Sequence, residues 1–166
     1  MNISFTGHRD YNYKEHEQRL NTLLVELVES AKCEVVNFYS GMAKGFDIEA
    51  AMSVLLLREE YPNVRLHAVI PYTGQANGFD EVERAKYEVI KETADSCVVL
   101  SKEYHTGTFH QRNDYLVDKS EIVVAYYNGE PKGGTHYTVR RARKRGRKLY
   151  NLCPPTSIPF FGVQME

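Results

Sequence analysis

Short apolar segments alternate with helical patterns along the chain. Six apolar runs predict strands over Asn2–Thr6, Glu34–Ser40, Val64–Ile70, Cys97–Ser101, Ile122–Tyr127 and Lys148–Leu152. The segments between them predict helices over Tyr13–Ala31, Phe46–Glu60, Gln111–Lys119 and Thr135–Arg145, and a further helix that Asp80 caps and that runs to about Ala94. Strands that alternate with helices form βαβ units with a parallel sheet.

This order of elements predicts the α/β class, with a three-layer Rossmann-like fold in which helices flank a mainly parallel, twisted sheet. The 166 residues suffice for one domain with a real core. We expect that domain to cover residues 1–152. The tail, residues 153–166, contains three prolines and is expected to be irregular.

Composition removes several function classes. The formal net charge of −1 gives no whole-protein attraction to nucleic acid, so such a partner needs a local patch. Cys33, Cys97 and Cys153 lie far apart, which predicts neither a disulfide framework nor a zinc site. We expect Cys33 and Cys97 to be small core residues, and we expect no metal and no cofactor.

The beginning of the chain enters a strand directly, without the charged start and long apolar stretch of a signal peptide. No run approaches the roughly 18 apolar residues of a membrane span. We therefore expect a cytoplasmic protein with no membrane contact.

Glycines and polar residues concentrate in the loops that follow the predicted strands. In an open parallel sheet, ligands bind outside the carboxyl ends of the strands, where these loops lie. The five loops are Thr6–Arg9, Ser40–Asp47, Pro71–Phe79, Ser101–Asn113 and Asn128–Thr135. This asymmetry predicts a pocket for a phosphate-bearing, nucleotide-like ligand.

Two of the loops have the features of a phosphate cradle. Gly41 and Gly45 allow close backbone approach, and the next helix directs free N–H groups at the loop. The alternative is a simple strand-to-helix turn. Asp47 would contact a ribose or complement the helix dipole. The glycines before Thr135 repeat the pattern, with Thr135 as a phosphate donor, an N-cap or both.

Basic residues supply the charge that such a ligand needs. Arg9, beside His8, can bind phosphate or carboxylate with its guanidinium fork, or pair with Asp10. Arg112 is a second candidate, and pairing with Asp118 is its alternative. The run Arg140, Arg141, Arg143, Lys144 and Arg145 is the local case for nucleic acid, against an ordinary solvated helix face. Tyr72 and Tyr104 could stack on a base.

The chain lacks the motifs of the common catalytic sites, including a nucleophile elbow and HExxH. His105 and His110 flank the fourth loop, and a metal pair or a general base there is a minor alternative.

Taken in order, four loop motifs resemble those of the SLOG superfamily, which includes the DNA-processing protein DprA and the LOG phosphoribohydrolases, and are most similar to its YpsA-like branch. The motifs are Thr6-Gly7-His8-Arg9, Ser40-Gly41-Met42-Ala43-Lys44-Gly45-Phe46-Asp47, Arg112-Asn113 with Val117-Asp118, and Gly133-Gly134-Thr135. The resemblance implies a nucleotide-type pocket, and it implies homo-oligomers. Its expected ligand-binding residues are Gly7, His8, Arg9, Ser40, Gly41, Gly45, Asp47, Arg112, Asn113, Gly133, Gly134 and Thr135.

One departure from this resemblance bears on catalysis. LOG enzymes carry a catalytic glutamate three residues after the glycine-threonine pair, and Thr138 stands at that position here. A hydroxyl does not stabilise a cationic ribosyl centre as a carboxylate does. We therefore expect a sensor or sequestering module for a nucleotide or an ADP-ribose-like molecule. The alternatives are a nucleotide hydrolase and a DprA-like binder of single-stranded nucleic acid.

Overall fold

Six parallel strands form one sheet in the computed structural model, which describes residues 1–154. The strands are β1 (Asn2–Gly7), β2 (Val36–Ser40), β3 (Val64–Ile70), β4 (Ser96–Val99), β5 (Ile122–Tyr126) and β6 (Lys148–Asn151). Their order is β4-β3-β2-β1-β5-β6, and each neighbouring pair is parallel. The predicted Rossmann-like class is confirmed, and the expected tail lies largely outside the described residues.

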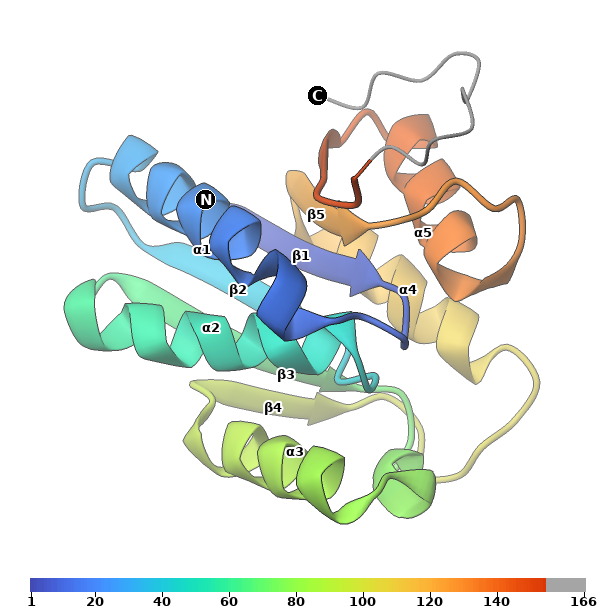
Figure 1. Ribbon diagram of the computed structural model, residues 1–166. Helices are drawn as coiled ribbons and strands as arrows, with labels where there is room; N and C mark the ends of the chain where they lie inside the picture. The colour runs from blue at the N-terminus through green and yellow to red at the C-terminus, as the bar shows by residue number, and fades with distance from the viewer. Residues whose placement is uncertain (155–166) are drawn as a thin grey trace.

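Helices cover both faces of this sheet (Figure 1). They are α1 (Tyr13–Ser30), α2 (Phe46–Glu60), α3 (Glu81–Thr93), α4 (Thr108–Lys119) and α5 (Gly133–Lys144), with a short 3-10 helix, η1 (Gln75–Gly78). The first three strand connections run toward β4, and the next two run from β4 back past β1 to β6. Because such connections are right-handed, α1, α2 and α3 share one face, and α4 and α5 the other.

The order of the strands changes direction between β1 and β5, which are parallel neighbours at the centre of the sheet. β1 also pairs with β2, so the carboxyl ends of all three strands lie side by side. A reversal of this kind leaves a crevice at the carboxyl edge of a parallel sheet. The fold thus places the predicted glycine-rich loops around one crevice.

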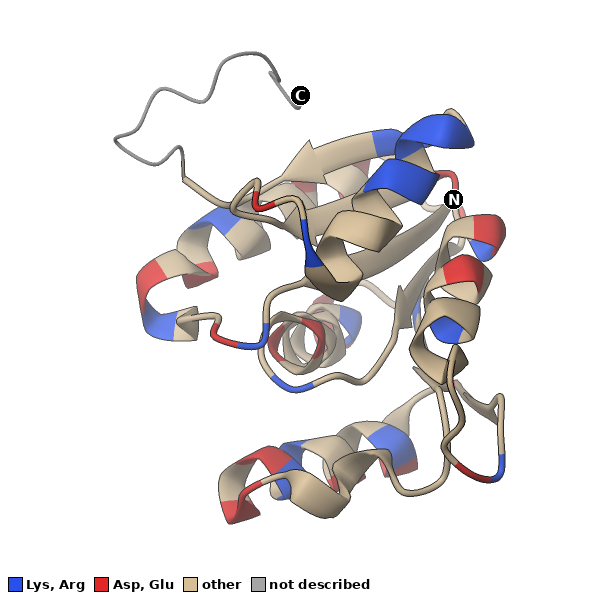
Figure 2. Ribbon diagram, turned by 90° about the vertical axis from the view of Figure 1, so that its right-hand side faces the viewer, with Lys and Arg blue, Asp and Glu red and all other residues tan. Residues whose placement is uncertain are grey.

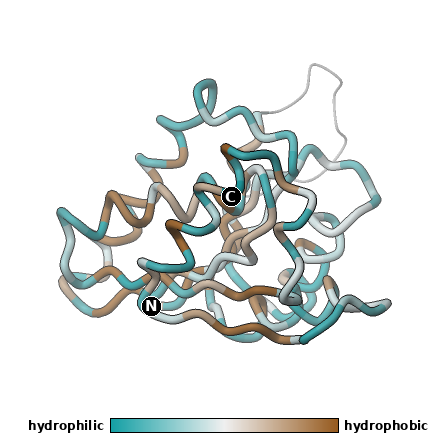
Figure 3. The backbone as a smooth tube through the Cα atoms, turned by 90° about the horizontal axis from the view of Figure 1, so that it is seen from below, coloured by the Kyte–Doolittle hydropathy of each residue, from teal (hydrophilic) through white to brown (hydrophobic). Residues whose placement is uncertain are grey.

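Two apolar cores, one on each face of the sheet, support the strands that carry these loops. On the α1–α3 face, Phe5 stacks on Phe38 with ring centroids 5.7 Å apart and meets the edge of Phe46 at 6.0 Å. On the other face, Val123 and Ala125 pack under α4 and α5 in a smaller cluster. The change between hydrophobic and hydrophilic positions along the helical turns is visible in Figure 3. The larger core contains Phe5 of β1 and Val124 of β5, and the smaller one contains Ala125 of β5, so the floor of the crevice is closely packed.

The structure differs from the sequence predictions at several boundaries. Helix α4 begins at Thr108 rather than Gln111, because Gly107 adopts a positive φ of 93° that ends the preceding loop. Helix η1 lies within a segment predicted only as a turn. The expectation that Cys33 and Cys97 are core residues is wrong, since both are exposed. Cys33 lies beyond the end of α1, in a turn where its φ is 70°. Cys97 lies on β4, the strand at the edge of the sheet.

Within residues 1–154, none of the helices combines the length and the apolar character that crossing a bilayer requires. In the same part of the chain, His, Cys, Asp and Glu side chains do not gather in groups of three that could hold a metal ion.

Helix α3 begins with a reciprocal cap that the sequence predicts in part. The Asp80 carboxylate accepts from the Glu83 N–H at 2.8 Å, and Glu83 accepts from the Asp80 N–H at 3.1 Å. We predict that Asp80→Ala lowers the free energy of unfolding by about 1 kcal/mol. Urea titration measures this loss. Glu81→Ala is the control, because it changes the same turn and leaves the cap intact. Equal losses in the two variants would show that the cap contributes nothing.

Candidate ligand-binding site

The loop after β1 and the loop after β2 are in direct contact through their backbones. A Cβ atom built on Gly7 would lie 2.4 Å from the Phe46 ring, and one on Gly45 would lie 2.4 Å from the Arg9 carbonyl oxygen. Gly45 also has a φ of +86°. The Phe46 N–H donates to the His8 carbonyl at 3.2 Å. Gly7 and Gly45 therefore allow the β1 loop to pack against the start of α2. A side chain at either position would block this approach, and the positive φ of Gly45 also favours glycine.

The loop between β2 and α2 is closed by its own side chains. The buried Ser40 hydroxyl donates to the Asp47 carbonyl at 3.0 Å and accepts from the Met42 N–H at 3.2 Å. Met42 has a φ of 62° and a fully buried side chain. Ser40 is thus a structural closure of the loop rather than a group free for a ligand.

A buried arginine from α4 reaches this loop across the crevice. Arg112 is 6% exposed, and its guanidinium donates to the Gly41 carbonyl. Its Nε donates to Asn113 Oδ1 at 2.7 Å. A Cβ on Gly41 would lie 2.7 Å from Arg112 Cδ, so a larger residue at position 41 would require the arginine to shift. The alternative pairing of Arg112 with Asp118 is wrong, because Asp118 meets Arg141 at 3.2 Å.

Asn113 extends this row of contacts to α5. Its side-chain nitrogen lies 3.6 Å from the position of a Cβ on Gly134. Gly41, Arg112, Asn113 and Gly134, which lie in three separate sequence motifs, are therefore contiguous along the crevice. We call these four residues the glycine–arginine row.

The start of α5 is open at the end of this row. Its N-cap is Lys132, without a side-chain cap hydrogen bond, and Gly133 and Gly134 are exposed. Thr135 is buried in the first turn, so the alternative that it is the N-cap is wrong. The amino end of α5 thus presents exposed backbone N–H groups and a positive dipole end to the crevice. The amino end of α2 adds a positive dipole end, but its Phe46 and Ile48 N–H groups already donate to the His8 and Ala43 carbonyls.

Asp47 lies behind the β2 loop, where it is 4% exposed. Burial raises the pKa of Asp47 to about 6, while Arg112, the Ala43 N–H and Arg9 act in the opposite direction. Its Oδ1 has no hydrogen-bond partner among the described residues. The carboxyl group therefore titrates near pH 6, where most other carboxylates are ionised.

His8 does not present a free ring to the crevice. Its Nε2 accepts from the Asn128 N–H at 2.9 Å, and its ring contacts Tyr126 and Tyr127. The bond fixes the loop after β5 on the loop after β1. His8 is therefore a positioning residue for the glycine-rich loop of α5.

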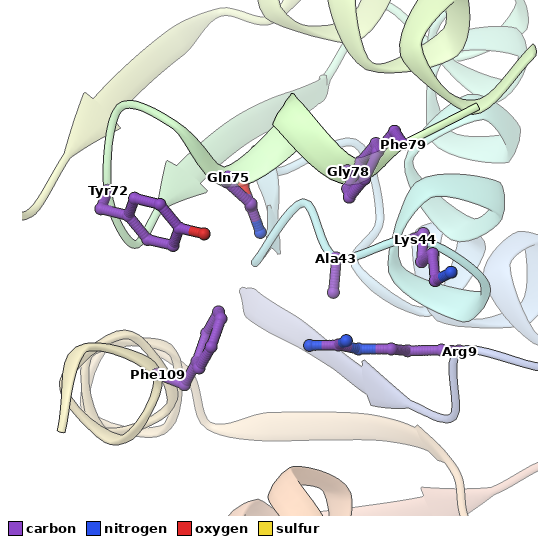
Figure 4. Close-up of a pocket in the computed structure, with 8 residues that line it drawn as sticks. All are labelled: Arg9, Ala43, Lys44, Tyr72, Gln75, Gly78, Phe79 and Phe109. Carbon is purple, nitrogen blue, oxygen red and sulfur yellow. The ribbon is translucent and has the colours of Figure 1, made fainter. Parts of the chain in front are cut away.

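A cavity of about 210 Å³ opens beside the β2 loop, on its β3 side (Figure 4). Its lining combines cationic and aromatic side chains: Arg9, Ala43, Lys44, Tyr72, Gln75, Gly78, Phe79 and Phe109. Of the twelve predicted ligand-binding residues, only Arg9 lines it. The rest of that set forms the crevice next to it or the supports of the crevice.

Sequence reasoning missed Phe109 and Gln75. Phe109 lies three residues before Arg112, and residues at this spacing share a helix face. The carbons at the centres of the Arg9 and Arg112 guanidinium groups lie 5.8 and 5.6 Å from the centre of the Phe109 ring. Gln75 donates to the Gly41 carbonyl at 3.0 Å from η1, which no helical pattern indicated. A cationic and aromatic wall is thus continuous with the glycine–arginine row.

The basic run on α5 lies at the other end of the helix. Arg140, Arg143, Lys144 and Arg145 are exposed. Arg141 is held between Asp114 at 3.0 Å and Asp118 at 3.2 Å. Figure 2 shows the basic turns of α5 away from its glycine end. Because α5 runs antiparallel to the strands, this patch lies at the opposite edge of the sheet from the crevice.

The two histidines of the fourth loop do not meet as a metal pair. The His110 ring stacks on Tyr137 with centroids 4.0 Å apart, and His105 Nδ1 lies 3.0 Å from the Thr106 carbonyl. Each ring thus contacts its own neighbours.

A parallel six-stranded sheet with glycine-rich loops at its carboxyl edge defines a Rossmann-like α/β protein. The chain belongs to the YpsA SLOG family, since the family model described as the YspA SLOG family matches residues 3–153. A relative from Halalkalibacterium halodurans, UPF0398 protein BH1768, is 30% identical over 149 residues, which cover 87% of this chain and 75% of that protein. A UPF0398 protein from Bacillus thuringiensis (strain Al Hakam) is 31% identical over 104 residues, 61% of this chain and 56% of that protein.

Solved structures confirm the fold. DNA processing protein A (DprA) from Streptococcus pneumoniae superposes with a TM-score of 0.66 at 21% identity, over 95% of this chain. The chain spans 52% of the length of that protein. DprA from Helicobacter pylori gives a TM-score of 0.66 at 22% identity, over 95% of this chain and 67% of that one.

Gly45 and Gly107 form a matched pair for testing loop contact. Both have positive φ, but a Cβ on Gly107 would meet nothing within 4 Å. We predict that Gly107→Ala costs about 1–2 kcal/mol of stability through backbone conformation alone. Gly45→Ala should cost at least roughly 2 kcal/mol more, because the Arg9 backbone must move. Denaturant unfolding checks both, and equal losses would mean that the two loops do not touch.

Asp47 predicts a pH dependence of stability. Between about pH 4 and pH 6, folded Asp47 holds a proton that the unfolded chain has lost. The free energy of unfolding therefore falls as pH rises through this window, by about 1–3 kcal/mol, and stays lower above it. Asp47→Asn should remove that fall and be the more stable protein at pH 7. Parallel pH profiles of the two proteins would contradict the assignment.

Proposed function

We propose that this chain binds a nucleotide or a nucleotide-derived, ADP-ribose-like ligand through its phosphate groups, as a sensor or sequestering module. The observation that carries the proposal is the glycine–arginine row, which joins two helix amino ends to one cationic and aromatic cavity. Each part suits a different portion of a nucleotide. The phosphates would lie at the exposed Gly134 end of the row, and the base would enter the cavity.

The anion-binding side rests on backbone and charge. The amino end of α5 offers N–H groups, and α2 and α5 both offer positive dipole ends, which favour phosphate. Arg9 is exposed and Lys44 is half-buried, and neither forms an ion pair within the part of the chain that the structure describes. Two cations without acidic partners at the mouth of a crevice favour an anionic ligand.

The base-binding side rests on the aromatic lining. In Figure 4, Tyr72 from the β3 loop and Phe109 from α4 lie near each other at one end of the cavity. Their ring centroids lie 6.1 Å apart. Aromatic faces and edges next to cations suit a flat heteroaromatic base, because every base offers a π-face for stacking.

Thr138 stands at the position of the catalytic glutamate of LOG enzymes, which favours ligand binding over LOG-type hydrolysis. Thr138 is fully buried, and its hydroxyl donates to the Gly134 carbonyl at 2.9 Å. The side chain thus supports the first turn of α5 and does not reach the crevice. Position 138 thus supplies no carboxylate to stabilise a cationic ribosyl centre.

Single-stranded DNA is the second candidate ligand. It is favoured by the fold shared with H. pylori DprA, whose structure describes a single-stranded DNA binding mode. If a strand binds here, the cavity with Arg9 and Lys44 is the expected contact. The exposed arginines of α5 lie at the other edge of the sheet and could contact only a longer strand.

Arg9→Ala tests the proposal. We predict that it weakens ADP binding by roughly 10- to 150-fold, the contribution of a hydrogen bond to a charged group. Arg140→Ala is the matched control, since it removes one exposed arginine from the far end of α5. Isothermal titration calorimetry with ADP measures both. Unchanged affinity for Arg9→Ala, or a larger loss for Arg140→Ala, would reject the crevice as the site.

A further inference from the structure

The cavity is too small for a whole nucleotide. Its volume is about 210 Å³, whereas pockets that enclose a complete small ligand measure roughly 300–1,000 Å³. A ligand seated there therefore keeps part of its structure outside. What surrounds the mouth of the cavity then decides which larger ligand the site favours.

An exposed tyrosine lies beside the cavity without lining it. Tyr104 is 60% exposed. Its ring centroid lies 5.5 Å from that of Tyr72 and 5.9 Å from that of Phe109. The three rings form one aromatic cluster, with Tyr72 and Phe109 on the cavity side and Tyr104 on the solvent side.

The loop that carries Tyr104 is held in place by its own hydrogen bonds. Ser101 Oγ donates to the Glu103 carbonyl at 2.8 Å, and the His105 N–H donates to Thr108 Oγ1 at 2.8 Å. These bonds flank Tyr104 on both sides. The loop around Tyr104 is thus held in place, so less conformational entropy is lost when a partner stacks on the ring.

We propose that this aromatic cluster provides two stacking positions, one base in the cavity and a neighbouring base on the exposed face of Tyr104. The favoured ligand then carries at least two bases joined by phosphate, as in a dinucleotide or a short single strand. The inference rests on the proposed function, because it places both bases relative to the same phosphate-binding crevice.

Binding of AMP and of the 5′-phosphorylated dinucleotide pApA by calorimetry tests this. The expected result is that pApA binds about 5- to 150-fold more tightly than AMP, the gain from one stacked base. A dinucleotide whose second base is absent should lose that gain. Tyr104→Ala should lose it too while its AMP affinity stays within about twofold, and Tyr104→Phe should retain it.

Two results would overturn the inference. In one, pApA binds no more tightly than AMP, which leaves the proposed function intact. In the other, Tyr104→Ala weakens AMP and pApA equally, which would place Tyr104 at the single base. If neither AMP nor pApA binds, the proposed function fails together with the inference. Comparison with dA12 distinguishes the source, because tighter binding of dA12 than of pApA indicates a strand rather than a free dinucleotide.

Discussion

The site depends on one buried guanidinium. Arg112 extends from α4 under the β2 loop, donates to the Gly41 carbonyl and is braced by Asn113. Burial lowers the pKa of the Arg112 guanidinium, and the nearby Asp47 carboxyl acts in the opposite direction. An arginine nevertheless stays charged in a protein, so its burial must be offset by acceptors.

The surroundings of Arg112 follow from this requirement. Glycine at position 41 leaves space for the arginine, because a Cβ there would overlap it unless the arginine shifted. Gln75 donates to the same carbonyl from η1, so the loops after β2 and β3 and helix α4 meet at a single backbone oxygen. A carbonyl oxygen has two lone pairs, so these two donors use its full acceptor capacity. This junction fixes the wall between the glycine–arginine row and the aromatic cavity.

Much of the fold could be predicted from the sequence because its cause is local and repeated. Apolar runs at period two and amphipathic helices at period 3.6 give the order of elements, and that order gives a parallel sheet. The glycine motifs likewise identified the carboxyl edge. The cavity could not be found in this way, because Phe109, Gln75 and Tyr72 meet only through tertiary packing. The closure role of Ser40 and the burial of Thr135 depend on neighbours that no spacing reveals, and Thr108 begins α4 early because Gly107 adopts a left-handed conformation.

The central claim is that the carboxyl edge of the sheet, and not the basic end of α5, receives a phosphate-bearing ligand. The most direct measurement is a two-dimensional 1H–15N NMR titration of the protein with ADP. The account predicts that amide signals of residues 41–45 and 133–135 shift together and saturate, while those of residues 140–145 stay in place. Shifts confined to residues 140–145 would contradict it and would place the anion at the opposite edge of the sheet.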